Sequence, residues 1–154
     1  MGLDMYLYKK TYVRNWDFMK KEELHEITVK RGGKIRTDIK PERISEITEL
    51  VCYWRKFNAL HNWFVKNCQN GVDDCKEYYV SKILLEELLT ELKEIYESNN
   101  KDVAKEKLPT QEGFFFGGTE YDEYYYGDVK ETIEMFESLL NEEEGGDLYY
   151  SSSW

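Results

Sequence analysis

The sequence predicts an α+β fold in which three main helices pack on one small, largely antiparallel sheet, as a single pair of layers. Apolar residues alternate with polar ones near the start of the chain, which is the period of a half-buried strand. Further along, apolar residues recur at the three- and four-residue spacing of helices. The length of 154 residues is close to the commonest size of one domain, so we expect residues 1–154 to share one core.

Both terminal segments are predicted to be strands of the same sheet. Residues 1–12 alternate around Met5, and residues 147–154 (DLYYSSSW) form a closing strand. Both segments are short and aromatic, and neither would be stable alone. We therefore expect Met5 and Tyr149 to lie in one sheet.

A hairpin is predicted at residues 26–38, where two short β-branched runs flank Gly32 and Gly33. Paired glycines can adopt the positive φ angles that a tight hairpin turn requires. Basic side chains line this hairpin, and charged residues of that kind protect exposed strand edges. A patch for nucleic acid is the alternative interpretation of the same side chains, which are Lys30, Arg31, Lys34 and Arg36.

The longest helix is predicted to run from Pro41 to about Cys68. Proline is favoured in the first turn of a helix, and Val51 and Trp54 follow at helical spacing. The helix is apolar on nearly all sides, which places it at the centre of the molecule or at an interface. His61 falls within its apolar arc, so we expect the imidazole to be mostly buried and hydrogen-bonded.

The rest of the chain is predicted to hold one more internal strand and two more helices. In order, we expect a turn at 69–74, a strand at 75–80, a helix from Ser81 to Ser98, a polar connector to Lys107, a buried strand or close-packed loop at 108–118, and a helix from Thr119 to the Gly145–Gly146 pair. Gly127 interrupts the last helical pattern. A helix that restarts with Asp128 as its cap is therefore the competing interpretation.

The net charge of −10 is unevenly distributed along the chain. Residues 1–43 hold eleven basic and seven acidic side chains, whereas residues 112–147 hold twelve acidic side chains and one lysine, Lys130. A field of this kind steers a basic partner and repels nucleic acid from the acidic end. The alternative interpretation is that the acidic side chains only solvate the surfaces of helices.

The sequence predicts a cytoplasmic protein. Its three cysteines lack the paired C-x-x-C spacing of a zinc site, and an odd number of thiols fits a reducing compartment. The first residues lack the pattern of a signal peptide, and no segment is long and apolar enough for a membrane span. We therefore expect neither export nor contact with a membrane.

A polar cluster on the predicted longest helix is the first candidate for a ligand site. Arg55, Asn58 and Asn62 are three and four residues apart, so their side chains can meet along one edge of the helix. His61 lies among them, and a histidine can carry a proton or bind a metal, although a buried histidine with a structural role is the more common case.

No cofactor or metal is expected from the motifs. Asp73, Asp74 and Cys75 follow the predicted helix, but their distance from His61 matches no known nucleophile or metal signature. Residues 117–122 (GGTEYD) precede a helix and resemble a phosphate cradle only in their glycines. Their acidic side chains would repel a phosphate and are better explained as first-turn residues of the helix.

Five stretches of the sequence resemble a group of small, uncharacterised proteins encoded by tailed phages and prophages. They are the opening MGLDMYL, the run YWRKFNALHNWFV, the stretch DDCKEYYVS, the block LPTQEGFFFGGTEYDEYYYGDV and the ending SSSW. The resemblance covers most of the chain except residues 14–43. It implies an origin in mobile elements and action in a bacterial cytoplasm, and it assigns no catalytic residue.

Two functions are consistent with these observations. The first is an accessory phage protein that binds and inhibits a host protein, such as a CRISPR effector or another immune nuclease. We expect such a protein to act by binding, not as an enzyme, and not to contact nucleic acid itself. Its partner would meet the acidic residues Glu120, Glu123, Glu131, Glu134, Glu137, Glu142, Glu143 and Glu144. The second is a small-ligand or nucleotide-binding protein, or an enzyme, with a site built from Arg55, Asn58, His61, Asn62, Asp74, Tyr78, Tyr121 and Asp122. The oligomeric state does not follow from the sequence.

Overall fold

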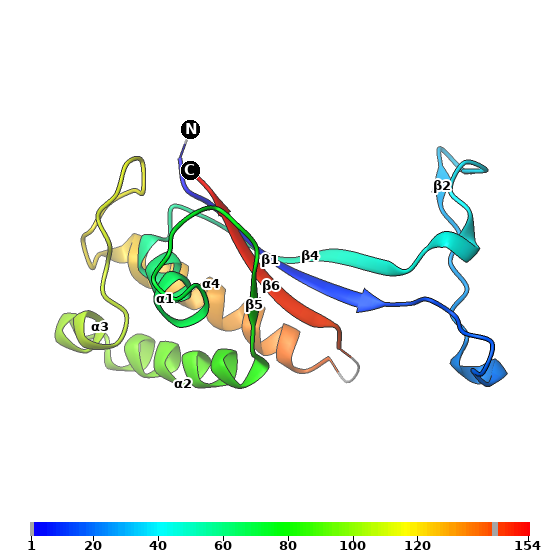
Figure 1. Cartoon of the computed structure of the whole chain (residues 1–154). Coiled ribbons are helices and arrows are strands. Elements are labelled where there is room, and N and C mark those ends of the chain that lie inside the picture. The colour runs from blue at the N-terminus through cyan, green and yellow to red at the C-terminus, as the bar shows by residue number, and fades with distance from the viewer. Residues whose placement is uncertain (1, 143–144) are drawn as a thin grey trace.

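The computed structural model describes residues 2–142 and 145–154 (Figure 1). They form an α+β fold, which confirms the predicted class. Its elements are β1 (Asp4–Tyr12), β2 (Lys30–Arg31), β3 (Lys34–Ile35), β4 (Glu46–Arg55), α1 (Asn58–Cys68), β5 (Tyr78–Val80), α2 (Lys82–Ser98), α3 (Lys101–Lys107), α4 (Glu123–Leu140) and β6 (Asp147–Ser153). The described residues thus hold four α-helices where three were predicted. The fourth is α3, which replaces the predicted connector, and the Asn100 side chain caps its first turn.

Four strands form one antiparallel sheet in the order β4, β1, β6, β5. β1 and β6 pair with Met5 opposite Ser152, and Tyr149 lies on the same strand as Ser152. The prediction that Met5 and Tyr149 share a sheet is therefore confirmed. Met1, the first residue of the predicted opening strand, lies outside the described residues, and β5 is shorter than the predicted strand at 75–80.

The predicted helix from Pro41 to Cys68 is wrong over much of its length, because residues 46–55 form β4 and only the last part is α1. The chain turns between the two elements at Lys56. Its φ of 59° is left-handed, and its N–H donates to the carbonyl of Leu3 at 2.7 Å. This turn directs α1 back over the sheet.

A β-bulge explains why β4 was not predicted. β1 pairs Leu7 with Cys52 but pairs the next residue, Tyr8, with Leu50, so Val51 is an extra residue in β4. An extra residue shifts the alternation of inward and outward side chains. The apolar residues on the two sides of the bulge therefore do not share one two-residue period, and the sequence lacks the usual sign of a strand.

The core lies on the face of the sheet that the helices cover. α2 packs against α4 beneath this face (Figure 1). Side chains of the sheet that point toward the helices alternate with more exposed ones, as expected for a half-covered antiparallel sheet. The buried apolar residues of the sheet, together with Leu3 just before β1, are Leu3, Met5, Leu7, Cys52, Trp54, Val80, Leu148 and Tyr150.

α4 is one continuous helix of 18 residues. Asp122 caps it, because its carboxylate accepts hydrogen bonds at 3.1 Å from the N–H groups of Tyr124 and Tyr125. The helix passes through Gly127 without a break, so the interpretation in which it restarts at Asp128 is wrong. Among the described residues, no helix is long and apolar enough to cross a membrane.

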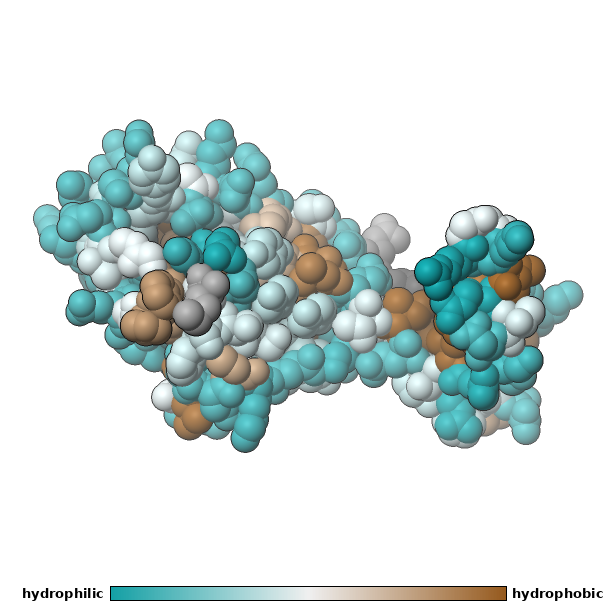
Figure 2. All heavy atoms as spheres, turned by 90° about the horizontal axis from the view of Figure 1, so that it is seen from above, coloured by the Kyte–Doolittle hydropathy of each residue, from teal (hydrophilic) through white to brown (hydrophobic). Residues whose placement is uncertain are grey.

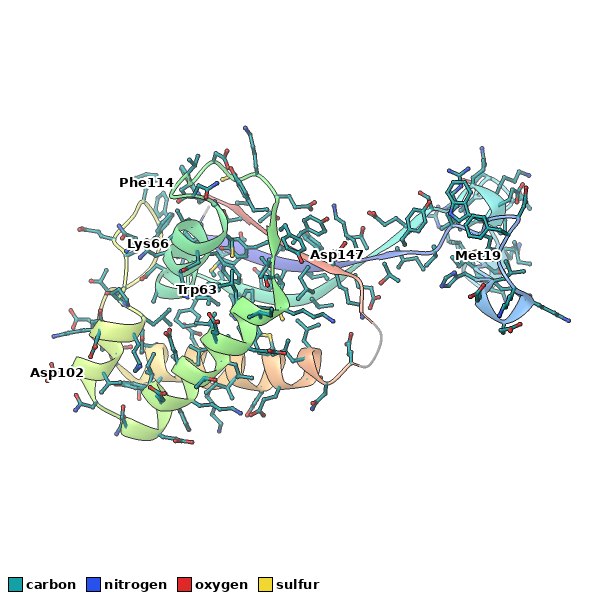
Figure 3. All side chains as sticks on the ribbon, turned by 60° about the horizontal axis from the view of Figure 1, so that its bottom comes forward. Met19, Trp63, Lys66, Asp102, Phe114 and Asp147 are labelled. Carbon is teal, nitrogen blue, oxygen red and sulfur yellow. The ribbon has the colours of Figure 1, made fainter. Side chains whose placement is uncertain are left out.

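β1 and β4 continue beyond β6 as a two-stranded arm that carries a lobe, residues 14–45 (Figures 1 and 2). β2 and β3 form the predicted hairpin within this lobe, with positive φ angles at Gly32 and Gly33. None of residues 14–45 is buried, and the side chain of Phe18 is 83% exposed. The lobe therefore has no core of its own, and it stands apart from the body of the molecule, as the position of Met19 in Figure 3 shows.

Candidate functional site

His61 is the most enclosed polar side chain of α1 and is held between two partners. Its side chain is 1% exposed. Nδ1 lies 2.6 Å from the hydroxyl of Tyr150 on β6, and Nε2 lies 2.9 Å from the carboxylate of Asp73. The prediction that His61 is buried and hydrogen-bonded is therefore confirmed.

The surroundings of Tyr150 fix the proton of its phenol. Burial, with a smaller contribution from the charge of Asp73, raises the pKa of Tyr150 well above its usual value, so the phenol keeps its proton. The phenol can donate to Nδ1 of His61 when Nε2–H donates to Asp73. The other oxygen of Asp73 accepts a hydrogen bond from Nε1 of Trp154 at 3.0 Å. In this arrangement both ring nitrogens are occupied, which is typical of a structural histidine.

Asn58, the first residue of α1, fastens the loop of residues 108–118 to the body. Its side-chain amide donates to the carbonyls of Phe116 and Gly118 at 3.1 and 2.8 Å, and its oxygen accepts from the N–H of Gln111 at 2.9 Å. The loop is close-packed where these bonds hold it. Of the two structures predicted for residues 108–118, a buried strand or a close-packed loop, the second is therefore the one observed. Phe116 is buried against the ring of His61, whereas Phe114 is 76% exposed.

The loop, α1 and the C-terminal residue Trp154 line an open pocket of about 440 Å³. We call it the aromatic pocket, and its lining residues are His61, Asn62, Val65, Asp73, Gln111, Glu112, Gly113, Phe114, Phe116 and Trp154. Figure 3 labels Phe114 on the loop that forms one wall. Gly113 is required there, because a Cβ atom at this position would lie 2.3 Å from the ring of Phe116.

The structure divides the ligand set that the sequence predicted. His61 and Asn62 line the aromatic pocket, and Asn58 supports the loop that forms one wall. Asp73 contacts His61, whereas Asp74, the carboxylate predicted to belong to the site, accepts a hydrogen bond from Tyr78 instead.

The other three predicted residues have different contacts. Tyr121 accepts a hydrogen bond from the N–H of Thr110 through its hydroxyl, at 3.0 Å. Asp122 caps α4, and Arg55 forms an ion pair with Asp4 at 2.8 Å. They therefore do not form one site with His61. Phe116 and Trp154, which complete the aromatic pocket, gave no signal in the sequence because the fold alone brings them to His61.

Arg55 and Asp122 line a second, smaller cleft of about 360 Å³ on the other side of the loop. Asp128 also lines this cleft. Burial, together with the charges of Glu131 and Asp122, raises the pKa of Asp128 to about 6. Acidic and basic side chains are mixed here, since Lys56 lines the same cleft.

The acidic residues predicted to bind a partner are brought together in part, in a groove between α4 and β4. We call this groove of about 710 Å³ the acidic groove, and it is lined by Val51, Tyr53, Glu131, Glu134, Met135, Ser138, Leu139 and Glu142. Three predicted acidic side chains therefore share one groove with apolar ones. β4 is also an edge strand of the sheet, so no further strand covers its outer side among the described residues.

The other predicted acidic residues lie elsewhere. Glu137 is on α4 but pairs with Lys93 of α2 at 2.9 Å. Glu120 lines the cleft that contains Asp128, and Glu123 lies near the opposite end of α4 from the acidic groove. Glu143 and Glu144 fall outside the described residues.

Comparison of the chain with family models finds no match, and neither the curated proteins nor the solved structures include a significantly similar one. Within residues 2–142 and 145–154, no three histidine, cysteine or acidic side chains are grouped so that they could hold a metal ion. The geometry of the aromatic pocket and the acidic groove is therefore the basis for a functional proposal.

Proposed function

We propose that this chain is a non-catalytic interaction protein that binds a basic surface of a host protein and inhibits it. The observation that carries the proposal is the acidic groove, which Glu131, Glu134 and Glu142 line together with apolar side chains. Charged and apolar groups in one groove provide two different contributions to binding. The carboxylates speed the approach of a basic partner. Covering the apolar side chains removes their surface from water and so stabilises the complex.

The edge position of β4 suggests how the partner is held. An extended segment can add to an exposed sheet edge through main-chain hydrogen bonds, while its side chains enter neighbouring pockets. Basic side chains on such a segment would meet Glu131 and Glu134 across the groove. One carboxylate is already compensated, because Glu142 forms an ion pair with Lys9. The two glutamates of α4 are therefore the main charges available to the partner.

The inhibitory role and the bacterial host rest on the resemblance to phage and prophage proteins. An accessory phage protein acts in the host cytoplasm, where immune nucleases such as CRISPR effectors carry basic grooves for nucleic acid. A protein with a net charge of −10 and an acidic groove is suited to occupy a basic groove of that kind.

A small-ligand protein or enzyme with a site around His61 is the second candidate. The aromatic pocket favours it, because its size is in the range of small-molecule sites. The contacts of His61 argue against catalysis, since Tyr150 and Asp73 occupy both ring nitrogens. Asp74 would not take part, since Tyr78 and Lys76 engage its carboxylate.

Capture from bacterial lysate tests the proposal. The immobilised chain should retain one host protein in a stoichiometric amount, and a variant with Glu131→Gln and Glu134→Gln should lose it. A matched control with Glu86→Gln and Glu87→Gln removes the same charge from exposed positions of α2. Equal capture by the groove variant and the control would contradict the proposed surface. A bound nucleotide without any protein would favour the second candidate.

A further inference from the structure

The aromatic pocket is lined by aromatic rings and by acidic side chains. Three aromatic rings line it, and two of them remain accessible, since Phe114 is 76% and Trp154 is 53% exposed. The third ring, Phe116, is buried and packs edge-on against Trp154 at 6.1 Å and against His61 at 5.3 Å. Exposed aromatic rings at a pocket mouth offer π faces to a ligand.

All the charged side chains that line the aromatic pocket are acidic. Asp73 and Glu112 line it, and no lysine or arginine does. Asp73 accepts hydrogen bonds from His61 and from Trp154, one on each carboxylate oxygen. Each oxygen can also accept a further hydrogen bond.

These features select for a flat organic cation. Aromatic faces attract cations through the ring quadrupole, and a guanidinium group is planar enough to stack on an indole while it donates hydrogen bonds to carboxylates. An anion would be repelled by Asp73 and Glu112. An uncharged ligand would be attracted less strongly by these two carboxylates.

We propose that the aromatic pocket is a binding site for a guanidinium group, which stacks against Trp154 and Phe114 and pairs with Asp73 and Glu112. Nothing in this site requires catalysis. The proposal does not depend on the acidic groove, because the two sites share none of their lining residues. The guanidinium can belong to an arginine side chain of a protein or to a free small molecule.

Binding can be measured with N-acetyl-L-arginine amide as the probe. Its uncharged isostere, N-acetyl-L-citrulline amide, has nearly the same size and shape and serves as the matched control. In ¹H–¹⁵N spectra the indole N–H signal of Trp154, identified by its loss in Trp154→Phe, should shift in a saturable way with the arginine probe. The citrulline probe should bind at least about tenfold more weakly, because it lacks the charge that the two carboxylates attract.

Substitution of Glu112 tests the role of charge in probe binding without disturbing the fold. Glu112 is exposed, so Glu112→Gln should leave the protein folded and weaken the arginine probe several-fold. The α2 variant with Glu86→Gln and Glu87→Gln should bind the probe like the unmodified chain. Equal binding of the two probes, the absence of a saturable shift, or equal weakening by the α2 variant would overturn the proposal.

A competition experiment distinguishes the two sources of the guanidinium group, an arginine side chain of a protein and a free small molecule. If the arginine probe displaces a host protein captured from lysate, and Glu112→Gln weakens that capture, the group belongs to the partner. If capture is unaffected while the probe binds, the group belongs to a free small molecule. Both results support a guanidinium site. A groove variant that no longer captures protein but still binds the probe would also leave this site intact.

Discussion

At the scale of single residues, the sequence predicted the state of His61 but not its partners. The expectation that His61 is buried came from a helix that was predicted to begin at Pro41. It holds because residues around His61 are helical in both the prediction and the structure, and they face the core. Asp73 was not distinguished from Asp74, because neighbouring carboxylates in a turn look alike until the chain path is known. Tyr150 and Trp154 are 89 and 93 positions away from His61, so only the sheet brings them close.

The network around His61 predicts a cost for Tyr150→Phe. The substitution keeps the ring, which stacks on Phe64 at 3.9 Å, but removes the hydroxyl that His61 contacts. A buried ring nitrogen without a partner costs about 1–3 kcal/mol of unfolding free energy. Urea unfolding of both proteins gives the difference. An unchanged midpoint would show that the hydroxyl contributes nothing to the fold.

Asp128 gives a prediction of pH dependence. The folded state raises the pKa of Asp128 from 3.8 to about 6, mainly through burial, so it favours the protonated carboxyl more than the unfolded state does. Stability is therefore lost as the pH rises through that interval, when the carboxyl ionises within the fold. Asp128→Asn should raise the melting temperature at pH 7.5 and leave it nearly unchanged below pH 3.8. An equal effect at both pH values would contradict the raised pKa.

At the scale of elements, regular patterns were predicted and irregular ones were not. The helix at α2 follows a plain leucine stripe, and its predicted range, from Ser81 to Ser98, agrees with the structure. β4 was missed because the bulge at Val51 disturbs its alternation. α3 was missed because seven polar and small residues give a weak helical period, and its position depends on Ala104 and Leu108 packing into the core.

Gly127 gives a prediction about α4. This glycine lies within the helix, is exposed, and a Cβ atom placed on it would meet nothing within 4 Å. Gly127→Ala should therefore raise the unfolding free energy by about 0.5–1 kcal/mol, measured by urea unfolding. Gly117→Ala is the contrasting substitution, because Gly117 has a φ of 89° and packs against Lys56, and it should destabilise the protein. A loss of stability in Gly127→Ala would contradict the continuous helix.

At the scale of the whole molecule, the chain separates an acidic body from a basic lobe. Residues 1–43, which were net basic in the sequence, include nearly the whole lobe, whereas the acidic residues 112–147 belong to the body. The uneven charge could be predicted from the sequence. The arm could not, because it depends on β1 and β4 being longer than β6, and β4 was taken for a helix.

The lobe should be dispensable for folding. Val13 and Ser45 are joined by a backbone hydrogen bond of 2.9 Å at the base of the lobe, so an Asn-Gly turn can replace residues 14–44 between them. Since none of these residues is buried, the melting temperature should change by less than about 4 °C, the shift that roughly 1 kcal/mol produces in a chain of this size. A shortened protein that fails to fold would show that the lobe supports the body.

The central claim is that the acidic groove binds a basic partner, and the association rate tests it most directly. Association of the captured host protein should be measured at low and high salt with the unmodified chain, with the Glu131→Gln and Glu134→Gln variant, and with the α2 control. The groove variant should associate at least about tenfold more slowly at low salt and depend less on salt, because steering by charge acts on the rate of encounter. The α2 control should keep most of the rate. Equal rates and equal salt dependence for all three proteins would contradict the claim.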